Sequence, residues 1–248
     1  MKHRIFFFSL FLITTGIQAQ IYIGISGGYG IPFAKERVGS VIQWDSAYHS
    51  VTSVMGSYGA GQHYTLYGGY SLNENIGVEL GANYLSGKKY TSAYANNYNN
   101  YSYNYESQVK SLRLVTSLRF TFGKKRINYY FKSGIVSGLF SQIRTNSAQV
   151  RGQEHTVWIS KAYGGIMLGV AASAGANFAV NKKLSLFLEA NSIGMHWAAL
   201  KRKTIKYEIN GVNNLSTLPA SQPYSTNEGK QYLPMSAVGL SIGLHFNF

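Results

Sequence analysis

Apolar and polar residues alternate one by one along much of the chain. In residues 109–122, one face of an extended chain would carry large apolar side chains at five positions. These are Leu112, Leu114, Leu118, Phe120 and Phe122, and the residues between them include Arg113 and Arg119. A period of two residues is typical of a β-strand, because successive side chains point to opposite faces of a sheet.

The alternation predicts about eight strands. They cover residues 20–33, 62–73, 75–86, 109–122, 127–141, 164–179, 183–194 and 235–248. The connections between them are alternately long and short. The long ones are residues 34–61, 87–108, 142–163 and 195–233, and the short ones are residues 73–75, 123–126 and 181–183. This order predicts an antiparallel up-and-down meander with short turns on one side and long loops on the other.

Alternation alone does not say which face of the sheet meets water. A soluble lipocalin-like barrel buries its apolar face inside, whereas a membrane barrel turns that face to lipid. The polar face here is rich in Gly and Ser. Gly weakens a strand and has no value on an open solvated face, whereas small residues relieve crowding inside a narrow eight-stranded barrel. These residues are Gly24, Ser26, Gly28, Gly30, Gly69, Ser71, Gly77, Gly81, Gly165, Gly169, Ser173, Gly175, Gly239, Ser241 and Gly243. The sequence therefore predicts that the polar face is the inside.

Aromatic residues gather on the apolar face near the strand ends. Those near the short turns or the C-terminus are Phe120, Phe122, Tyr129, Phe131, Phe178, Phe246 and Phe248. Those near the long loops are Tyr29, Tyr64 and Tyr84. Amphipathic rings favour the headgroup level of a bilayer, so the two groups predict two interfacial girdles.

Residues 1–19 differ from the rest of the chain. Lys2, His3 and Arg4 precede the apolar run 5–16, and Ala19 supplies a small residue at a cleavage point, which is the pattern of a secretory signal peptide. The run is shorter than the roughly 18 apolar residues that suggest a spanning helix. We therefore expect a signal peptide at residues 1–19 and one membrane β-barrel domain at residues 20–248.

Composition narrows the class of protein. Charged residues make up 13% of the chain, against roughly 25% in an ordinary soluble domain. The absence of Cys excludes disulfides, thiolate chemistry and a lipid anchor on Cys. The formal net charge of +14 suits acidic lipid headgroups or nucleic acid. No nucleic-acid-binding motif is present, and an exported protein rarely meets that partner, so we expect no nucleic acid.

Three features carry a resemblance to a known family: the signal peptide, the strands rich in Gly and aromatic residues, and the closing GLSIGLHFNF at residues 239–248. Through them the chain resembles the small eight-stranded outer-membrane barrels of diderm bacteria. It looks like the barrels of outer membrane proteins A and X, without a peptidoglycan-binding domain. The resemblance covers nearly all of residues 20–248. It implies an all-β, antiparallel, up-and-down transmembrane barrel in the bacterial outer membrane, with short periplasmic turns and long extracellular loops.

The resemblance also implies roles for the final strand. Its alternating residues look like the signal read by the barrel-assembly machinery during insertion: Leu240, Ile242, Leu244, Phe246 and Phe248. In a closed barrel this strand pairs with the first one, so no edge remains and every backbone group is satisfied. The alternative, an apolar edge strand of a soluble sheet, would invite aggregation.

Charged residues on the predicted inner face form a candidate cluster. Counted from the short turns, Glu79, Arg119, Lys132 and Glu189 stand at about the same level, whereas Arg113 stands higher without an obvious partner. Buried charges are tolerated when they are paired, so we expect a structural ion-pair network that plugs the barrel near its periplasmic end. The alternative role is a gate or an ion path.

Other candidate chemistry is weak. Ser192 and His196 lie where the seventh strand would leave the membrane, but four residues of extended chain hold them roughly 13 Å apart, too far for a nucleophile and its base. The histidines show no metal-binding spacing. We therefore predict no enzyme, no catalytic or metal site and no cofactor.

The long loops carry the better functional candidates. Residues 90–107 combine Asn with rigid aromatic side chains, which is the composition of a recognition surface; the candidates are Tyr94, Tyr98, Tyr101, Tyr103 and Tyr105. The alternative is that this segment only continues the fourth strand above the membrane as a hairpin. The last loop carries a basic cluster suited to the phosphates of lipopolysaccharide, namely Lys201, Arg202, Lys203 and Lys206.

These observations predict a barrel with a structural or surface-interaction role. Its lumen is expected to be filled by side chains, and its loops to face outer-membrane lipids and an extracellular protein or glycan. The alternatives are a narrow pore and a lipid-modifying enzyme of the outer membrane.

Overall fold

The computed structural model describes residues 20–45, 48–123, 126–219, 222–223 and 232–248. The signal-peptide prediction concerns residues 1–19, which lie outside these ranges. None of the helices in the described part of the chain has the length and apolar character needed to cross a bilayer.

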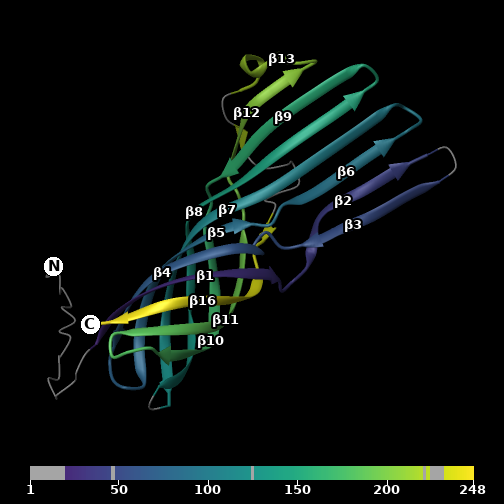
Figure 1. Cartoon of the computed structure of the whole chain (residues 1–248). Coiled ribbons are helices and arrows are strands. Elements are labelled where there is room, and N and C mark those ends of the chain that lie inside the picture. Colours follow the sequence, from purple (N-terminus) through teal and green to yellow (C-terminus); the bar gives the residue numbers. More distant parts are fainter. Residues whose placement is uncertain (1–19, 46–47, 124–125, 220–221, 224–231) are drawn as a thin grey trace, which may run out of the picture.

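Eight long strands form a closed antiparallel ring (Figure 1). Each pairs with the next in the chain order of the eight. The strands are β1 (Ile21–Pro32), β4 (Gly61–Ser71), β5 (Ile76–Gly87), β7 (Tyr101–Phe122), β8 (Ile127–Arg151), β10 (Met167–Ala179), β11 (Leu184–Trp197) and β16 (Ala237–Asn247). The predicted eight-stranded up-and-down barrel is confirmed.

The last strand closes the barrel on the first. The pairing of β16 with β1 runs from Asn247 opposite Tyr22 to Ala237 opposite Pro32. At the very end, the backbone N–H of Phe248 donates to the carbonyl of Ile21 at 3.0 Å. The terminal strand therefore has a partner on both sides, which is the condition for an extended chain to cross a bilayer.

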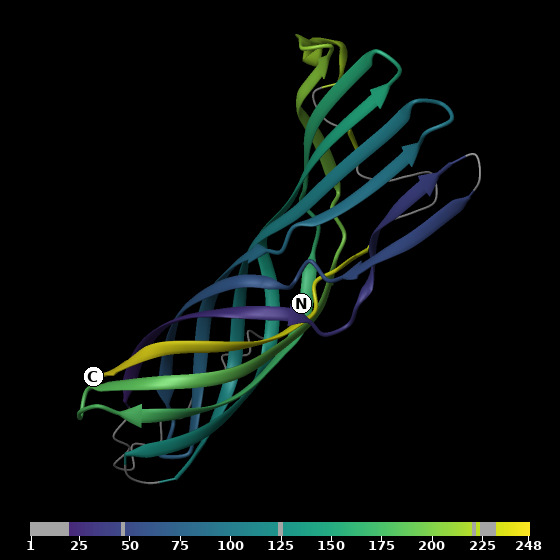
Figure 2. The same ribbon diagram turned by 45° about the vertical axis from the view of Figure 1, so that its right-hand side comes forward.

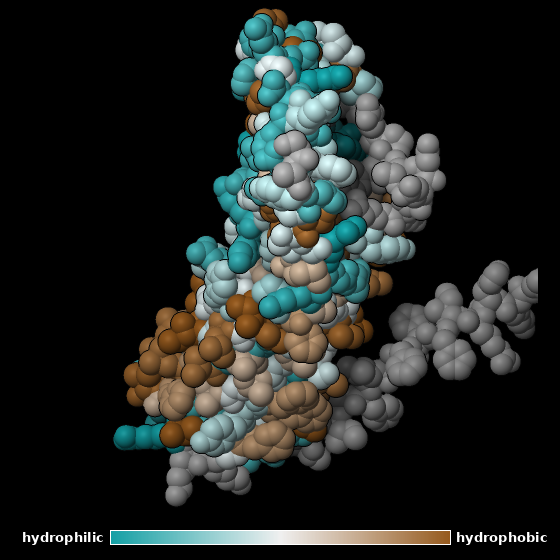
Figure 3. All heavy atoms as spheres, turned by 90° about the vertical axis from the view of Figure 1, so that its right-hand side faces the viewer, coloured by the Kyte–Doolittle hydropathy of each residue, from teal (hydrophilic) through white to brown (hydrophobic). Residues whose placement is uncertain are grey.

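Large apolar side chains point outward from the ring. Ile25, Ile135 and Leu240 are 53%, 64% and 63% exposed. Figure 3 shows brown hydrophobic side chains gathered on the barrel half of the molecule and mainly hydrophilic ones on the other half. A soluble barrel would bury its apolar face inside, so the exposed belt makes this a transmembrane barrel. The soluble alternative is therefore excluded.

Glycines on the inner face make room for aromatic rings. A Cβ atom on Gly24 would lie 2.1 Å from Cζ of Tyr67, and one on Gly69 would lie 2.1 Å from Cζ of Tyr22. The small residues thus relieve crowding in the lumen as expected. Gly165 is an exception: it has a φ of +92° and precedes β10, which begins at Met167 and not at residue 164.

Four of the ring's long connections are largely strands and not irregular loops. Strands β7 and β8 continue beyond the barrel, and further strands join them in a sheet ordered β13-β12-β9-β8-β7-β6-β2-β3 (Figures 1 and 2). The added strands are β2 (Glu36–Trp44), β3 (His49–Gly56), β6 (Tyr90–Asn96), β9 (Glu154–Tyr163), β12 (Lys201–Ile209) and β13 (Val212–Asn213). We call this the extracellular sheet. The short remaining elements are η1 (Leu215–Thr217), β14 (Gln222–Pro223) and β15 (Leu233–Pro234).

The two faces of the extracellular sheet follow from the barrel. Along β8, Val136 and Ile143 are buried on the side of the lumen, and Thr145 and Ser147 continue this face upward. We call this side the inner face. Arg144 and Asn146 alternate with these residues and lie on the opposite side, which we call the outer face.

Candidate functional site

The four lumenal charges expected at one level do meet. Lys132 Nζ lies 3.2 Å from Glu79 Oε2 and 2.5 Å from Glu189 Oε2. Arg119 Nη1 donates to Glu79 Oε1 at 2.9 Å. The residues come from β5, β7, β8 and β11, and Arg119 and Lys132 are direct cross-strand partners. Glu79 and Arg119 are only 3% and 6% exposed, so mutual pairing is what makes their burial tolerable.

Aromatic residues surround this ion-pair cluster. The buried ones are Tyr22, Tyr67, Tyr130 and Phe187. The hydroxyls of Tyr22 and Tyr130 each donate to a carboxylate, Glu79 Oε1 and Glu189 Oε2, at 3.0 Å. The Arg119 guanidinium lies 4.4 Å from the centre of the Tyr130 ring. We call these charges and rings together the lumenal layer.

Sequence reasoning missed the aromatic part of this layer, because it considered aromatic residues only on the apolar face. Tyr22 is two residues from Gly24, and Tyr67 is two residues from Gly69. Residues two apart on a strand share a face, so these rings point into the lumen as the glycines do. Their position among small residues was the available signal. The consequence is a lumen filled by large rings that lie across glycine positions.

A second barrier lies at the extracellular mouth. Its buried side chains, which we call the mouth cluster, include Tyr58, Leu85, Tyr90, Val109, Trp197, Leu233 and Met235. The hydroxyl of Tyr90 accepts from the Ser57 N–H at 3.1 Å and donates to the Ser57 carbonyl at 2.9 Å. Burial raises the pKa of the Tyr90 phenol, so this hydroxyl stays protonated and keeps its donor. The backbone of Tyr58 is tied to Pro234 at 2.8 Å, which joins two connections across the mouth.

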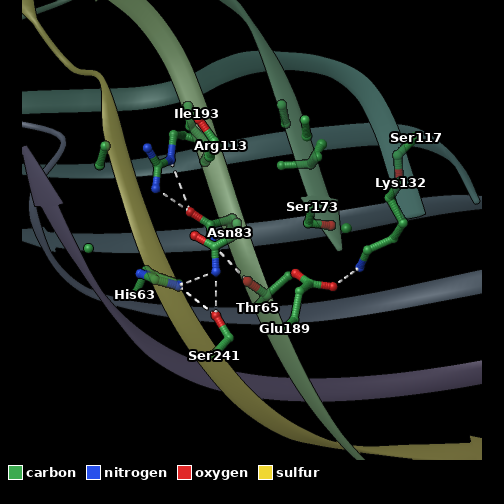
Figure 4. Close-up of a pocket in the computed structure, with 18 of the residues that line it drawn as sticks. His63, Thr65, Asn83, Arg113, Ser117, Lys132, Ser173, Glu189, Ile193 and Ser241 are labelled. Carbon is green, nitrogen blue, oxygen red and sulfur yellow. Dashed lines mark hydrogen bonds and ion pairs between the residues drawn. The ribbon is translucent and has the colours of Figure 1, made fainter. Parts of the chain in front are cut away.

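Between the two barriers lies a cavity of about 90 Å³ (Figure 4). Arg113 lines it at 2% exposure, above the level of the ion pairs. Its Nε and Nη2 both donate to Oδ1 of Asn83, at 2.9 and 2.5 Å. Arg113 therefore has an uncharged partner that the sequence did not reveal, and no carboxylate among the described residues pairs with it.

The tyrosine-rich segment is a hairpin, as its alternative interpretation predicted. Strands β6 and β7 pair antiparallel, with Tyr94 opposite Tyr103. Alternation and cross-strand contacts bring four of the five candidates to the inner face: Tyr94, Tyr101, Tyr103 and Tyr105. The Tyr103 ring stacks on Trp158 of β9, with ring centres 5.5 Å apart, and Tyr94 meets Tyr101 edge to face at 5.4 Å. Tyr98 stays apart in the hairpin turn and is 85% exposed.

The basic cluster of the last connection is divided between the two faces. Arg202 lies on the inner face, where its Nε donates to Ser160 Oγ at 3.2 Å. Lys203 lies on the outer face and is the direct cross-strand partner of Lys161, which in turn is opposite Arg144 on β8. We call Arg144, Lys161 and Lys203 the basic row. Like charges directly opposite one another destabilise a sheet unless an anion lies against them.

The catalytic alternative lacks a suitable geometry. Strand β11 is continuous from Leu184 to Trp197, so the chain does not turn between Ser192 and His196. The imidazole of His196 instead contacts the carboxylate of Glu36, with Nε2 and Oε1 3.1 Å apart. The two residues therefore do not form a nucleophile and base pair.

The predicted assembly residues lie on the lipid side of the last strand. Ile242 and Phe246 are 64% and 41% exposed, and Phe248 is 76% exposed. Leu240 and Leu244 alternate with the inward-facing residues in the same way. This placement is what a terminal recognition strand requires, and its reading by assembly machinery stays a prediction.

No family model and no curated protein matches the sequence. Among solved structures, the chain is similar to outer membrane protein OprG from Pseudomonas aeruginosa, with 12% identity over 94% of this chain and 98% of that one and a TM-score of 0.47. It is similar to Neisserial surface protein A, with 11% identity over 93% and 99% and a TM-score of 0.43. It is also similar to Ail, the attachment invasion locus protein of Yersinia pestis, solved with the heparin analogue sucrose octasulfate, with 10% identity over 93% and 97% and a TM-score of 0.33.

Proposed function

We propose that this protein is an exported barrel of the bacterial outer membrane that acts through its extracellular sheet and not through its lumen. The observation that carries the proposal is the double closure of the barrel. The lumenal layer crosses the lumen in the periplasmic half, and the mouth cluster closes the extracellular end. Much of the chain lies beyond the apolar belt, and β8, for example, continues to Arg151. A surface-interaction role follows.

The narrow pore is the main competing function, and conductance separates the two. Mature protein refolded in detergent and added to planar lipid bilayers should give no discrete channels. Because two barriers close the lumen, the positive comparison must open both. It combines Tyr58→Ala and Met235→Ala in the mouth cluster with Tyr67→Ala and Tyr130→Ala in the lumenal layer. Regular single-channel steps from the unaltered protein would contradict a closed lumen.

The inner face of the extracellular sheet is the proposed binding surface, with an extracellular glycan or protein as ligand. Stacked and edge-to-face rings present rigid amphipathic area at low entropic cost, and neighbouring Asn and Ser residues add adaptable hydrogen bonds. Tyr103 and Trp158 form the central stacked pair, and Arg202 adds a cation on the same face. A sheet face that carries aromatic and basic groups suits an extended polar chain.

Paired variants test this surface. Trp158→Ala removes the central ring from the inner face, whereas Ile159→Ala changes the next residue on the outer face. Binding of purified protein to immobilised glycans and to host extracellular matrix proteins should fall for Trp158→Ala and for Tyr103→Ala and persist for Ile159→Ala. Equal binding by all three variants would show that the aromatic face is not the contact.

The basic row favours a second interaction, with the membrane itself. Arg144, Lys161 and Lys203 lie on the outer face just above the belt, where phosphate groups of lipopolysaccharide would lie. An anionic lipid headgroup would relieve the repulsion between these neighbouring cations. This contact would hold the extracellular sheet against the membrane surface.

A further inference from the structure

The lumen carries one more positive charge than negative charge among the described residues that face it. Arg113, Arg119 and Lys132 are the cations, and Glu79 and Glu189 are the carboxylates. The ion pairs account for Arg119, Lys132 and both carboxylates. Arg113 is therefore the charge left without a counter-ion.

The surroundings of Arg113 hold its guanidinium in one place. Asn83 Nδ2 donates to Thr65 Oγ1 at 2.7 Å, so the Asn83 amide presents its oxygen to Arg113. That oxygen accepts from Nε and Nη2, while Nη1 is buried and has no hydrogen-bond partner among the described residues. Arginine does not lose its proton in proteins, so the charge remains. A buried, unpaired charge costs several kcal/mol.

The cavity beside Arg113 is of limited size, and polar side chains line part of it. Its volume of about 90 Å³ suits a small ion with a few water molecules and excludes a sugar phosphate or a lipid headgroup. On the opposite wall, Asn191 Nδ2 donates to Ser241 Oγ at 2.7 Å, and His63 Nε2 lies 2.9 Å from the same hydroxyl (Figure 4). A water molecule would satisfy the Nη1 donor but would not neutralise the charge.

We propose that this cavity is a binding site for one small monovalent anion of the halide class, held by Arg113. A second negative charge on the ion would be repelled by Glu79 and Glu189, which line the same cavity, so a divalent anion is disfavoured. Chloride is the abundant ion of this class outside cells. The lumenal layer and the mouth cluster lie on either side of the cavity, so we expect the anion to be taken up as the barrel folds.

Refolding in different salts tests the site in the mature barrel. Protein refolded in micelles in sodium chloride or sodium bromide should have a higher urea midpoint than protein refolded in sodium gluconate of equal ionic strength, because gluconate is too large for the cavity. The Arg113→Met variant should lose the difference between the salts. The matched control is Lys110→Met, which removes an exposed cation from the same strand and should keep the difference.

Bromide gives a direct readout that needs no variant. Crystals of protein refolded in bromide should show an anomalous peak within hydrogen-bond reach of Arg113 Nη1, and crystals from gluconate should show none. If Arg113→Met does not fold, the presence or absence of this peak decides whether the cavity binds an anion. Water in the cavity without an anomalous peak, together with equal midpoints in all salts, would overturn the proposal. A salt effect that Lys110→Met removes and Arg113→Met keeps would also overturn it.

Discussion

Arg119 of β7 donates a hydrogen bond of 2.9 Å to Glu79 of β5 inside the barrel, where the two side chains are only 7% and 4% exposed. The Arg119→Ala substitution leaves this carboxylate with Lys132 as its one partner of opposite charge among the described residues. Breaking a buried pair typically costs about 3–5 kcal/mol. We expect a clearly lower urea midpoint in micelles.

A double variant isolates the charge effect from the loss of packing. Glu79→Gln combined with Arg119→Met removes both charges and should recover part of the stability lost in Arg119→Ala. Lys110→Ala, at an exposed position of the same strand, should have little effect. An unchanged midpoint for Arg119→Ala would mean that the pair does not contribute to stability.

Gly24 is predicted to be intolerant of any side chain. A Cβ atom at this position would lie 2.1 Å from the Tyr67 ring, which is itself packed edge to face against Phe187. Overpacking of this kind typically costs about 1–3 kcal/mol. The Gly24→Ala variant should therefore unfold at a lower urea concentration.

The matched control is Gly27→Ala on the lipid side of the same strand, where the new Cβ would lie 3.5 Å from Tyr64 and make ordinary contact. Adding Tyr67→Leu to Gly24→Ala should restore part of the loss by removing the opposing ring. Equal midpoints for the Gly24 and Gly27 variants would refute the crowding argument.

Phe248→Ala is predicted to affect insertion in cells more than folding in detergent. The side chain is 76% exposed to the bilayer interface, and the backbone pairing of its N–H with Ile21 does not need the ring. Assembly machinery that recognises the terminal aromatic residue would bind the variant less well. The measurement compares heat-modifiable protein inserted in cells with refolding yield in micelles.

Phe122→Ala controls for general loss of an interfacial ring, because Phe122 is also exposed, at 57%, but lies far from the terminus in sequence. It should lower both quantities to a similar small extent. If Phe248→Ala behaves in the same way, Phe248 contributes only ordinary interfacial packing.

Neutralising the basic row is predicted to abolish stabilisation by lipopolysaccharide. Each cation near an anionic membrane surface contributes about 1 kcal/mol, so the triple change Arg144→Gln, Lys161→Gln and Lys203→Gln should remove about 3 kcal/mol of added stability. The readout is the rise in urea midpoint when lipopolysaccharide is added to the micelles, and high salt should reduce it.

Neutralising Lys182 and Lys183 provides the comparison, because these cations lie in a short turn at the other end of the barrel. That variant should respond to lipopolysaccharide as the unaltered protein does. If lipopolysaccharide raised the urea midpoint of the triple variant as much as that of the unaltered protein, the basic row would not contact phosphates.

The sequence by itself determined the eight barrel strands and the direction in which their side chains point. In a membrane barrel every residue faces either lipid or lumen, so the contrast between Ile25 and Gly24, or Leu118 and Arg119, repeats at each step. This contrast reveals both the two-residue period and which residues of each strand face the lumen. Strand ends in the short turns were predicted within a few residues for the same reason.

The extracellular sheet was hidden in the sequence because its two faces do not differ enough in polarity. In the hairpin of β6 and β7, the Tyr side chains lie on the inner face, but they are amphipathic, and Asn and Ser occur on both faces in water. The alternation of polarity is therefore weak although the strands are regular. The long connections therefore looked like loops. Only cross-strand pairing in the folded chain orders them, as Tyr103 of β7 and Trp158 of β9 show by stacking across β8.

Partners inside the lumen were decided by the tertiary structure alone. The level of Glu79, Arg119, Lys132 and Glu189 could be counted from the turns, because each residue of a strand adds about the same rise. Whether a side chain then meets a neighbour depends on the register and tilt of the strands around the ring, which local sequence does not encode. That is why Arg113 faces the amide of Asn83 and a cavity in the lumen, a relationship that exists only once the barrel has closed.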